Sequence, residues 1–163
     1  MNAFKFLPIL LVALLAVVAI AERSRADTGK IELAVECHCT DSVGLRLCAD
    51  FKSNVVDSPG YRLAASNSGY GIGIHFSCVD LWGGLDNRLA GTMSAVSVAF
   101  TIYSDKLPGE VYEDSSVFRV GKDATTEMSR KIIAAIGQLV TANRALFQHL
   151  AQAEQKPLPS PSP

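Results

Sequence analysis

The chain has 163 residues, of which 48% are hydrophobic and 19% charged, and its formal net charge at neutral pH is −1. This composition excludes a disordered or collagen-like protein. The near balance of acids and bases also speaks against a nucleic-acid-binding protein, which needs a basic face to displace the counterions of the phosphates. The sequence indicates where the protein is exported, the redox state of its cysteines and its fold class, but it contains no catalytic motif.

The amino terminus has the pattern of a secretory signal peptide. Lys5 is followed by an uncharged stretch over 6–21, and two candidate cleavage sites end at Ala21 and at Ala26, of which the second is preferred. We therefore expect cleavage before Asp27. The alternative is an uncleaved membrane anchor, although the stretch contains Pro8 and is shorter than the roughly 20 apolar residues of a spanning helix. The mature protein is expected to be periplasmic or secreted.

The cysteines fit this compartment, because an even number in an exported chain predicts disulfides. The four are Cys37, Cys39, Cys48 and Cys78. A zinc site is less favoured, since Cys48 and Cys78 each lack a second ligand at the short spacing typical of such sites. Three pairings are possible. The slightly preferred one joins Cys39 to Cys48 and Cys37 to Cys78, and we expect neither a metal nor a cofactor.

The first half of the mature chain predicts a strand, a helix and two more strands. Residues 30–39 alternate between apolar and polar, which is typical of a half-buried strand. A helix follows to about Asp57, with Thr40 or Asp41 as its cap and apolar residues at a four-residue spacing. Pro59 and Gly60 end it. The next segments are a short strand over 61–65, a turn over 66–69 and a strand over 70–81.

The second half predicts a meander and one long helix. A loop over 82–88 leads to a long strand over 89–104, a turn over 105–109 and a fifth strand over 110–120. Apolar periodicity then continues from Thr125 to Glu154, with a plausible cap at its start. At 1.5 Å per residue this helix would reach about 45 Å and extend beyond the sheet.

The order β-α-β-β-β-β-α predicts an α/β (α+β) fold, a two-layer sandwich in which a mixed sheet of about five strands has both helices on one face. We expect a signal peptide at 1–26, a single domain at 27–155 and a Pro/Ser-rich extended tail at 156–163. The layout is similar to that of small periplasmic α/β domains of envelope-assembly proteins. That similarity concerns architecture alone, so it implies no site residues.

The candidate binding residues lie on the outer face of the third strand and in the loop after it. They are His75, Ser77, Asp80, Trp82, Asp86 and Arg88. Gly71 and Gly73 share this face and would let another surface approach closely. His38 could converge with His75 if their strands are neighbours. Each position also has a structural interpretation: Trp82 can cover the end of the core, and Asp86 can form a turn.

Two function classes follow. The favoured one is a secreted or periplasmic non-enzymatic domain that binds a partner or supports envelope assembly. The alternative is a small hydrolase or ligand-binding protein that uses the outer sheet face and the Trp82 loop. We expect a protein partner or a second copy, bound through the outer face or through Leu146, Phe147 and Leu150 at the overhanging helix end. The alternative for that end is a helix that frays near Asn143. Nucleic acid is not expected, and membrane contact is expected only through an uncleaved signal.

Overall fold

The computed structural model describes residues 29–65 and 69–155. The expected signal peptide, the turn residues 66–68 and the tail at 156–163 lie outside the described residues and stay predictions. The elements are β1 (Ile31–Cys39), α2 (Ser42–Val56), β2 (Tyr61–Leu63), β3 (Tyr70–Asp80), β4 (Met93–Ser104), β5 (Val111–Gly121), α3 (Thr125–Ala142) and α4 (Arg144–Gln155).

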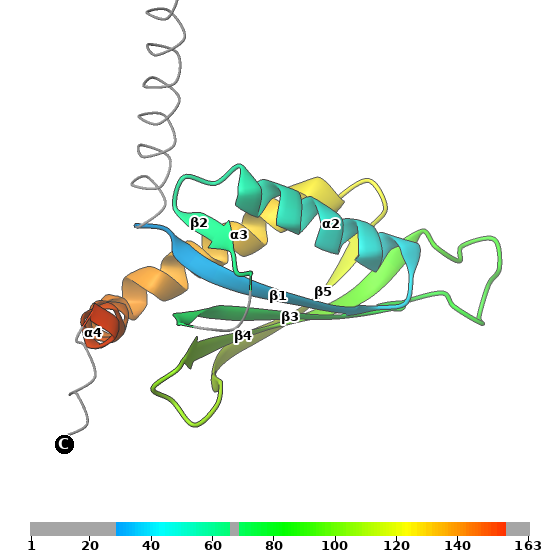
Figure 1. Cartoon of the computed structure of the whole chain (residues 1–163). Helices are drawn as coiled ribbons and strands as arrows, with labels where there is room; N and C mark the ends of the chain where they lie inside the picture. Colours follow the sequence, from blue (N-terminus) through cyan, green and yellow to red (C-terminus); the bar gives the residue numbers. More distant parts are fainter. Residues whose placement is uncertain (1–28, 66–68, 156–163) are drawn as a thin grey trace, which may run out of the picture. The chain divides into compact units, whose positions relative to one another are not determined.

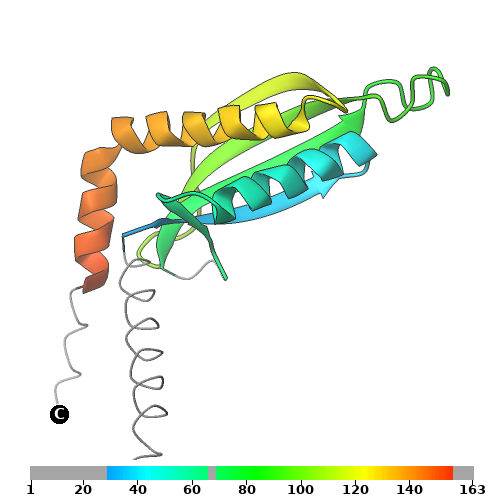
Figure 2. The ribbon, with the colours of Figure 1, turned by 90° about the horizontal axis from the view of Figure 1, so that it is seen from above.

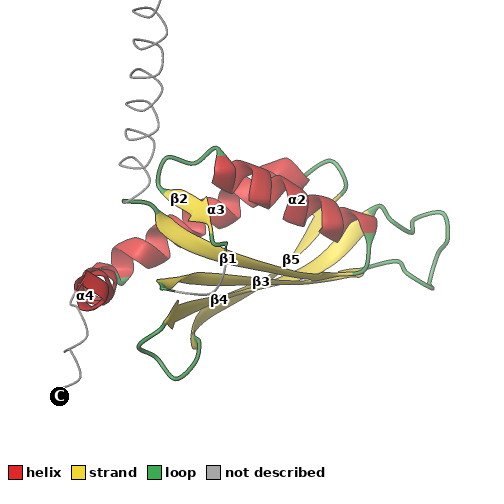
Figure 3. Cartoon of the chain, in the orientation of Figure 1, coloured by secondary structure: helices red, strands yellow, loops and turns green. Residues whose placement is uncertain are grey.

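The strands form one mixed sheet in the order β2-β1-β3-β4-β5 (Figure 1). β1 is parallel to both of its neighbours, while β3, β4 and β5 form an antiparallel meander. α2 and α3 lie on the same face of the sheet, which is clear from above in Figure 2 and from the colouring of Figure 3. The expected two-layer α+β fold is therefore confirmed.

The hydrophobic core lies between these two layers and follows the periodicities of the sequence. Alternate residues of β3 and β4 are buried, as are residues of α2 at a four-residue spacing. Phe51 of α2 meets Phe76 of β3 edge-on, with their ring centroids 5.2 Å apart. Each fully buried side chain of this size contributes about 1.5–3 kcal/mol. The members from these elements are Val43, Leu47, Cys48, Phe51, Val55, Ile72, Ile74, Phe76, Cys78, Val96, Val98, Phe100 and Ile102.

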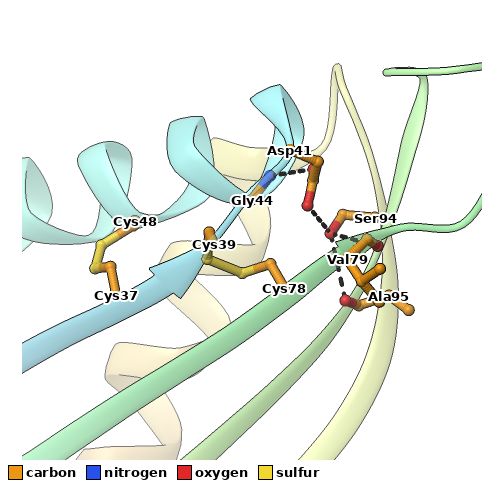
Figure 4. Close-up of a disulfide and its surroundings, with 9 residues drawn as sticks. All are labelled: Cys37, Cys39, Asp41, Gly44, Cys48, Cys78, Val79, Ser94 and Ala95. Carbon is orange, nitrogen blue, oxygen red and sulfur yellow. Dashed lines mark hydrogen bonds between the residues drawn. A yellow bond between two sulfur atoms is a disulfide. The ribbon is translucent and has the colours of Figure 1, made fainter. Parts of the chain in front are cut away.

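Asp41 fixes the start of α2, as the sequence predicts. One carboxylate oxygen accepts a hydrogen bond from the Gly44 amide at 2.8 Å, which satisfies an otherwise unpaired donor of the first turn. The other oxygen accepts from the hydroxyl of Ser94 at 3.0 Å (Figure 4). Both residues are buried. Asp41 therefore joins the beginning of α2 to the beginning of β4.

Two disulfides connect this region, Cys37–Cys48 between β1 and α2 and Cys39–Cys78 between β1 and β3 (Figure 4). The preferred pairing of Cys39 with Cys48 and Cys37 with Cys78 is therefore wrong. In the parallel register, Cys39 lies opposite Cys78, whereas Cys37 lies opposite Phe76. α2 runs back over β1, so a residue further along the helix meets an earlier residue of the strand.

The loop after β3 is longer than the sequence pattern indicates. β4 begins at Met93 and not at Leu89. The segment before it is held in turns: the Ala90 amide donates to the Asp86 carbonyl at 3.0 Å, and Gly91 has a φ of +74°. Glycine adopts this left-handed conformation without the steric cost that other residues pay. The apolar Leu89 thus belongs to the loop.

The predicted long helix is two helices, α3 and α4, which meet at Asn143 and point in different directions (Figure 2). The Asn143 amide donates to the Leu139 carbonyl at 3.0 Å, and its side-chain nitrogen donates to the same oxygen at 3.2 Å. Asparagine competes in this way with regular helical bonding. The sequence periodicity continues across the break, so it gave no signal of it.

The break at Asn143 changes the exposure of the apolar residues that we expected to extend beyond the sheet. Phe147 and Leu150 are 6% exposed and belong to the core cluster, whereas Leu146 is 40% exposed. The premise of an uncovered apolar stripe therefore holds for Leu146 alone. Association through this helix stays a prediction.

The start of α3 also differs from the expected cap. Ala124 occupies the cap position and makes no side-chain hydrogen bond there. The hydroxyls of Thr125 and Thr126 instead donate to the Asp50 carboxylate of α2, at 2.7 and 2.9 Å. These bonds fix the beginning of α3 against the middle of α2. The two helices are thereby positioned together over one sheet face, and neither of them covers the other face.

Candidate functional site

A row of polar side chains crosses this outer sheet face. In the parallel β1–β3 register, Glu36 lies directly opposite His75. The His75 Nδ1 atom is 3.1 Å from Glu36 Oε2, and its Nε2 atom is 2.8 Å from Glu110 Oε2. Thr101 of β4 donates to the same Glu110 oxygen at 2.6 Å. His75 is thus held between two carboxylates from opposite sides, one of them just before β5.

His38 does converge on this row, but it does so through a carboxylate. Its Nε2 atom is 3.6 Å from the Glu36 oxygen that also contacts His75. Glu36 therefore lies between the two imidazoles. The sequence pattern placed the two histidines on the outer face, with Glu36 beside His38, yet it did not identify Thr101 or Glu110 as members of the same group.

Gly73 makes this arrangement possible. A Cβ atom at Gly73 would collide with the Thr101 hydroxyl and lie 3.0 Å from His75 Nε2 and 3.1 Å from Glu110 Oε2. At Gly71, a Cβ atom would lie 2.5 Å from the Tyr103 hydroxyl. The outer-face glycines were interpreted as space for an approaching partner. In the structure, side chains of the chain itself occupy that space.

The Thr101 hydroxyl, by donating to Glu110, holds the pKa of that carboxyl below its usual value, and His75 adds to the effect. A lowered pKa means that these contacts stabilise the ionised carboxylate in the folded state. Their contribution to folding is complete above the ordinary carboxyl range and is lost as the pH falls through the lowered value. The Glu110 carboxylate thus contributes stability at neutral pH that is lost in acid.

Replacing Thr101 with Val should raise the pKa of Glu110, because it removes the main hydrogen bond to the carboxylate while keeping a similar volume. Stability should also become less dependent on pH in the acidic range. NMR titration of the Glu110 side-chain carboxyl in both proteins measures the shift. An unchanged titration of Glu110 would contradict the hydrogen bond from Thr101. The control variant is Thr92→Val, in the loop before β4.

The geometry does not favour nucleophilic catalysis by this row. A general base needs a nitrogen within hydrogen-bond reach of the nucleophile. Both ring nitrogens of His75 contact carboxylates, and its hydrogen bonds go to Glu36, Thr101 and Glu110. Ser77 lies two residues further along β3, on the same face. Among the described residues, no three His, Cys, Asp or Glu side chains are grouped so that they could hold a metal ion.

A shallow hollow of about 330 Å³ lies beside the row, over β4. Its lining is mainly apolar and includes His38, Ser77, Val79, Ala95, Ser97 and Val117. The register explains its shape: the small Ala95 lies opposite Val79, and the small Ser97 lies opposite Val117. Val79 and Val117 are 59% and 78% exposed. Two exposed valines on β3 and β5 therefore flank a strand of small residues.

The polar residues of the Trp82 loop mainly form hydrogen bonds that hold the loop itself. One oxygen of Asp80 accepts from the Trp82 amide at 2.9 Å, and the other accepts from the Gly91 amide at 2.8 Å. Asp80 thus closes both ends of the loop. Asp86 accepts from the Arg88 amide at 2.9 Å, as in the expected turn. The loop extends past the end of β3 (Figure 1). The structure therefore does not bring the candidate residues Asp80, Trp82, Asp86 and Arg88 together with His75 and Ser77.

The pair of disulfides is typical of a protein of an oxidising, extracytoplasmic compartment. None of the helices in the residues described is both long enough and apolar enough to cross a bilayer.

No family model matches the sequence, and no curated protein matches it. Among solved structures, the chain is similar to a proposed lipoprotein from Caulobacter crescentus. The two are 18% identical, the match covers 78% of this chain and 93% of the other, and the TM-score is 0.28. The functional argument therefore rests on the residues of this chain alone.

Proposed function

We propose that this chain is a secreted or periplasmic domain without catalytic activity, which binds another protein or supports envelope assembly through its outer sheet face. The observation that carries the proposal is the hollow over β4, where Val79 and Val117 project from a face that neither α2 nor α3 covers. Exposed apolar groups gathered on one surface are typical of interaction sites.

The polar row supports a binding role for the same face. Hydrogen bonds hold His75 and Glu110 in place, so this part of the surface is already ordered before a partner arrives. A preorganised surface loses less conformational entropy on binding. The small side chains Ala95, Ser97 and Ala99 leave the backbone of β4 open to close approach. The face therefore combines apolar contact with fixed polar groups at its margin.

Binding of a small apolar ligand is the second candidate, because a volume of about 330 Å³ lies at the lower end of the range for ligand pockets. The hollow is open, and such sites usually bury most of their ligand. Hydrolysis has less support, since the His75 contacts leave no nitrogen directed at Ser77.

Site-specific photo-crosslinking in the producing cell tests the proposal. A photoreactive residue at Val79 should give discrete cross-linked products, whereas the same residue at Leu85, an exposed position at the tip of the Trp82 loop, should not. Adding Ser97→Trp to the Val79 variant should abolish the products, because the larger side chain fills the hollow. Equal products from both positions, or none from Val79, would contradict the proposal. Binding of an apolar fluorescent probe that Ser97→Trp blocks would favour the ligand alternative.

A further inference from the structure

β5 is the long edge of the sheet. It spans eleven residues and pairs on one side with β4, whereas the opposite edge, β2, has three residues. In the described part of the chain no other strand pairs with β5. An edge strand directs every second backbone N–H and C=O away from the sheet, and proteins commonly protect such edges with Pro or Lys. β5 contains neither residue. Its charged side chains are Glu113, Asp114 and Arg119, and its pairing with β4 shifts register opposite Phe100 and Thr101.

A cleft of about 350 Å³ runs between this edge and the carboxyl-terminal half of α3. Phe100 and Leu139 contribute its apolar lining, Ala135 and Gln138 come from α3, and Glu113 and Asp114 come from β5. On the helix side of β5, the short Asp114 and Ser116 are exposed. α3 therefore does not cover this part of the sheet, and the cleft remains open beside the unpaired edge.

The edge and the cleft together have the geometry of a strand-addition site. A sixth strand beside β5 would make main-chain hydrogen bonds with the outward groups of the edge. Because side chains alternate along a strand, every second side chain of the added strand would point to the helix side of the sheet, where the cleft lies. In such complexes the main-chain bonds supply affinity, and the pockets for alternate side chains supply specificity.

The charge of the cleft indicates which side chains it would receive. Glu113 and Asp114 form no ion pair with any described residue. The Asp114 carboxylate accepts from the neighbouring Ser115 amide at 2.7 Å. Two carboxylates at one cleft attract cations and repel acidic side chains, over a distance that falls as salt is added.

We infer that β5 binds an extended, basic segment of a partner protein, which adds to the sheet as a sixth strand and directs Lys or Arg side chains into the cleft at Glu113 and Asp114. This inference rests on the proposed function as a binding domain, and it names a second surface and the chemistry of its occupant. The outer-face hollow would then contact another part of the partner.

Hydrogen exchange with synthetic peptides tests the inference. The probe is an eight-residue capped peptide that alternates Val and Lys, compared with the same peptide carrying Glu in place of Lys. In the full exported protein, the Lys peptide should slow the exchange of alternate β5 amides, namely those directed outward. It should bind at least tenfold more tightly than the Glu peptide, and the difference should shrink in high salt.

Charge-neutral variants localise the binding site. Replacing both acids, Glu113→Gln with Asp114→Asn, should weaken the Lys peptide by about five- to tenfold, which corresponds to about 1–1.4 kcal/mol. The single change Asp114→Asn is compared with Asp57→Asn, a matched loss of one exposed acid beyond the end of α2, which should have no effect. Circular dichroism confirms that each variant keeps its fold.

Three outcomes would overturn the inference. The first is no change in β5 exchange with either peptide. The second is equal binding of both peptides. The third is a concentration-dependent dimer, seen by sedimentation without peptide, whose formation itself protects the β5 amides, since the occupant would then be a second copy. Cross-links from Val79 with unchanged β5 exchange would remove this inference and leave the proposed function standing.

Discussion

Removing the Cys39–Cys78 disulfide by changing both cysteines to Ala is expected to lower the free energy of unfolding by about 4 kcal/mol. The bond joins positions 39 residues apart in sequence, so it removes many conformations from the unfolded chain. Its two Cα atoms are only 4.4 Å apart, because they lie opposite each other in the parallel register. Alanine is preferred to serine, since Cys78 is buried and a hydroxyl there would lose its hydrogen bonds to water.

The Cys37–Cys48 disulfide is the matched comparison. It closes a segment of 11 residues, for which the same chain-entropy relation gives about 3 kcal/mol. Urea unfolding of the two double-Ala variants should therefore rank Cys39–Cys78 as the larger loss, with midpoints that fall in the same order. A reversed ranking would contradict the entropic account. Peptide mapping of the oxidised protein should recover only these two pairs, and any other pair would contradict the structure.

Local periodicity predicted most of the fold, because it depends on residues that are near one another in sequence. The alternation in β3 identified Ile72, Ile74 and Phe76 as inward-facing, and all three are fully buried. Side-chain chemistry identified Thr40 or Asp41 as the helix cap, and Asp41 is the one that accepts from Gly44 as a cap does. Burial and capping can be predicted from the residues of a single short segment.

Contacts between segments that are distant in sequence were predicted less well. The disulfide partners depend on the register of β1 against β3 and on how far α2 runs back over β1, and neither is encoded by a spacing along the chain. The break at Asn143 also depends on tertiary packing. Apolar residues continue on both sides of it, and beyond it Phe147 and Leu150 enter the core. Tertiary packing determined these features.

The candidate site shows this difference most clearly. His75 and Ser77 were placed on the outer face from alternation, but the partners of His75 come from β1 and from the turn before β5. Glu36 could have been paired with His75 only if the two strands were known to be parallel neighbours in this register. Glu110 was assigned to the fifth strand with no role. Its contact depends on a strand pairing that contains a register shift at Phe100 and Thr101.

Gly44→Ala should lower the free energy of unfolding by about 2–3 kcal/mol, although the same change in an ordinary helix stabilises it by about 0.5–1 kcal/mol. A Cβ atom at Gly44 would overlap the Cβ atom of Cys78 and lie 2.8 Å from its Sγ atom and 3.0 Å from Asp41 Oδ2. Cys78 cannot move aside freely, because β3 and the disulfide to Cys39 hold it. α2 would have to lift from the sheet at its first turn, where Asp41 caps it.

Gly137→Ala is the matched control, since Gly137 also lies within a helix, α3, and its added Cβ atom would meet Tyr61 at an ordinary 3.5 Å. We expect this change to be neutral or stabilising by up to about 1 kcal/mol. Urea unfolding compares the two variants. A second background, Cys39→Ala with Cys78→Gly, removes the two Cys78 atoms nearest to the added Cβ atom and leaves the Asp41 contact at 3.0 Å, so most of the penalty should disappear there. A penalty of equal size in both backgrounds would show that contact with Cys78 is not its cause.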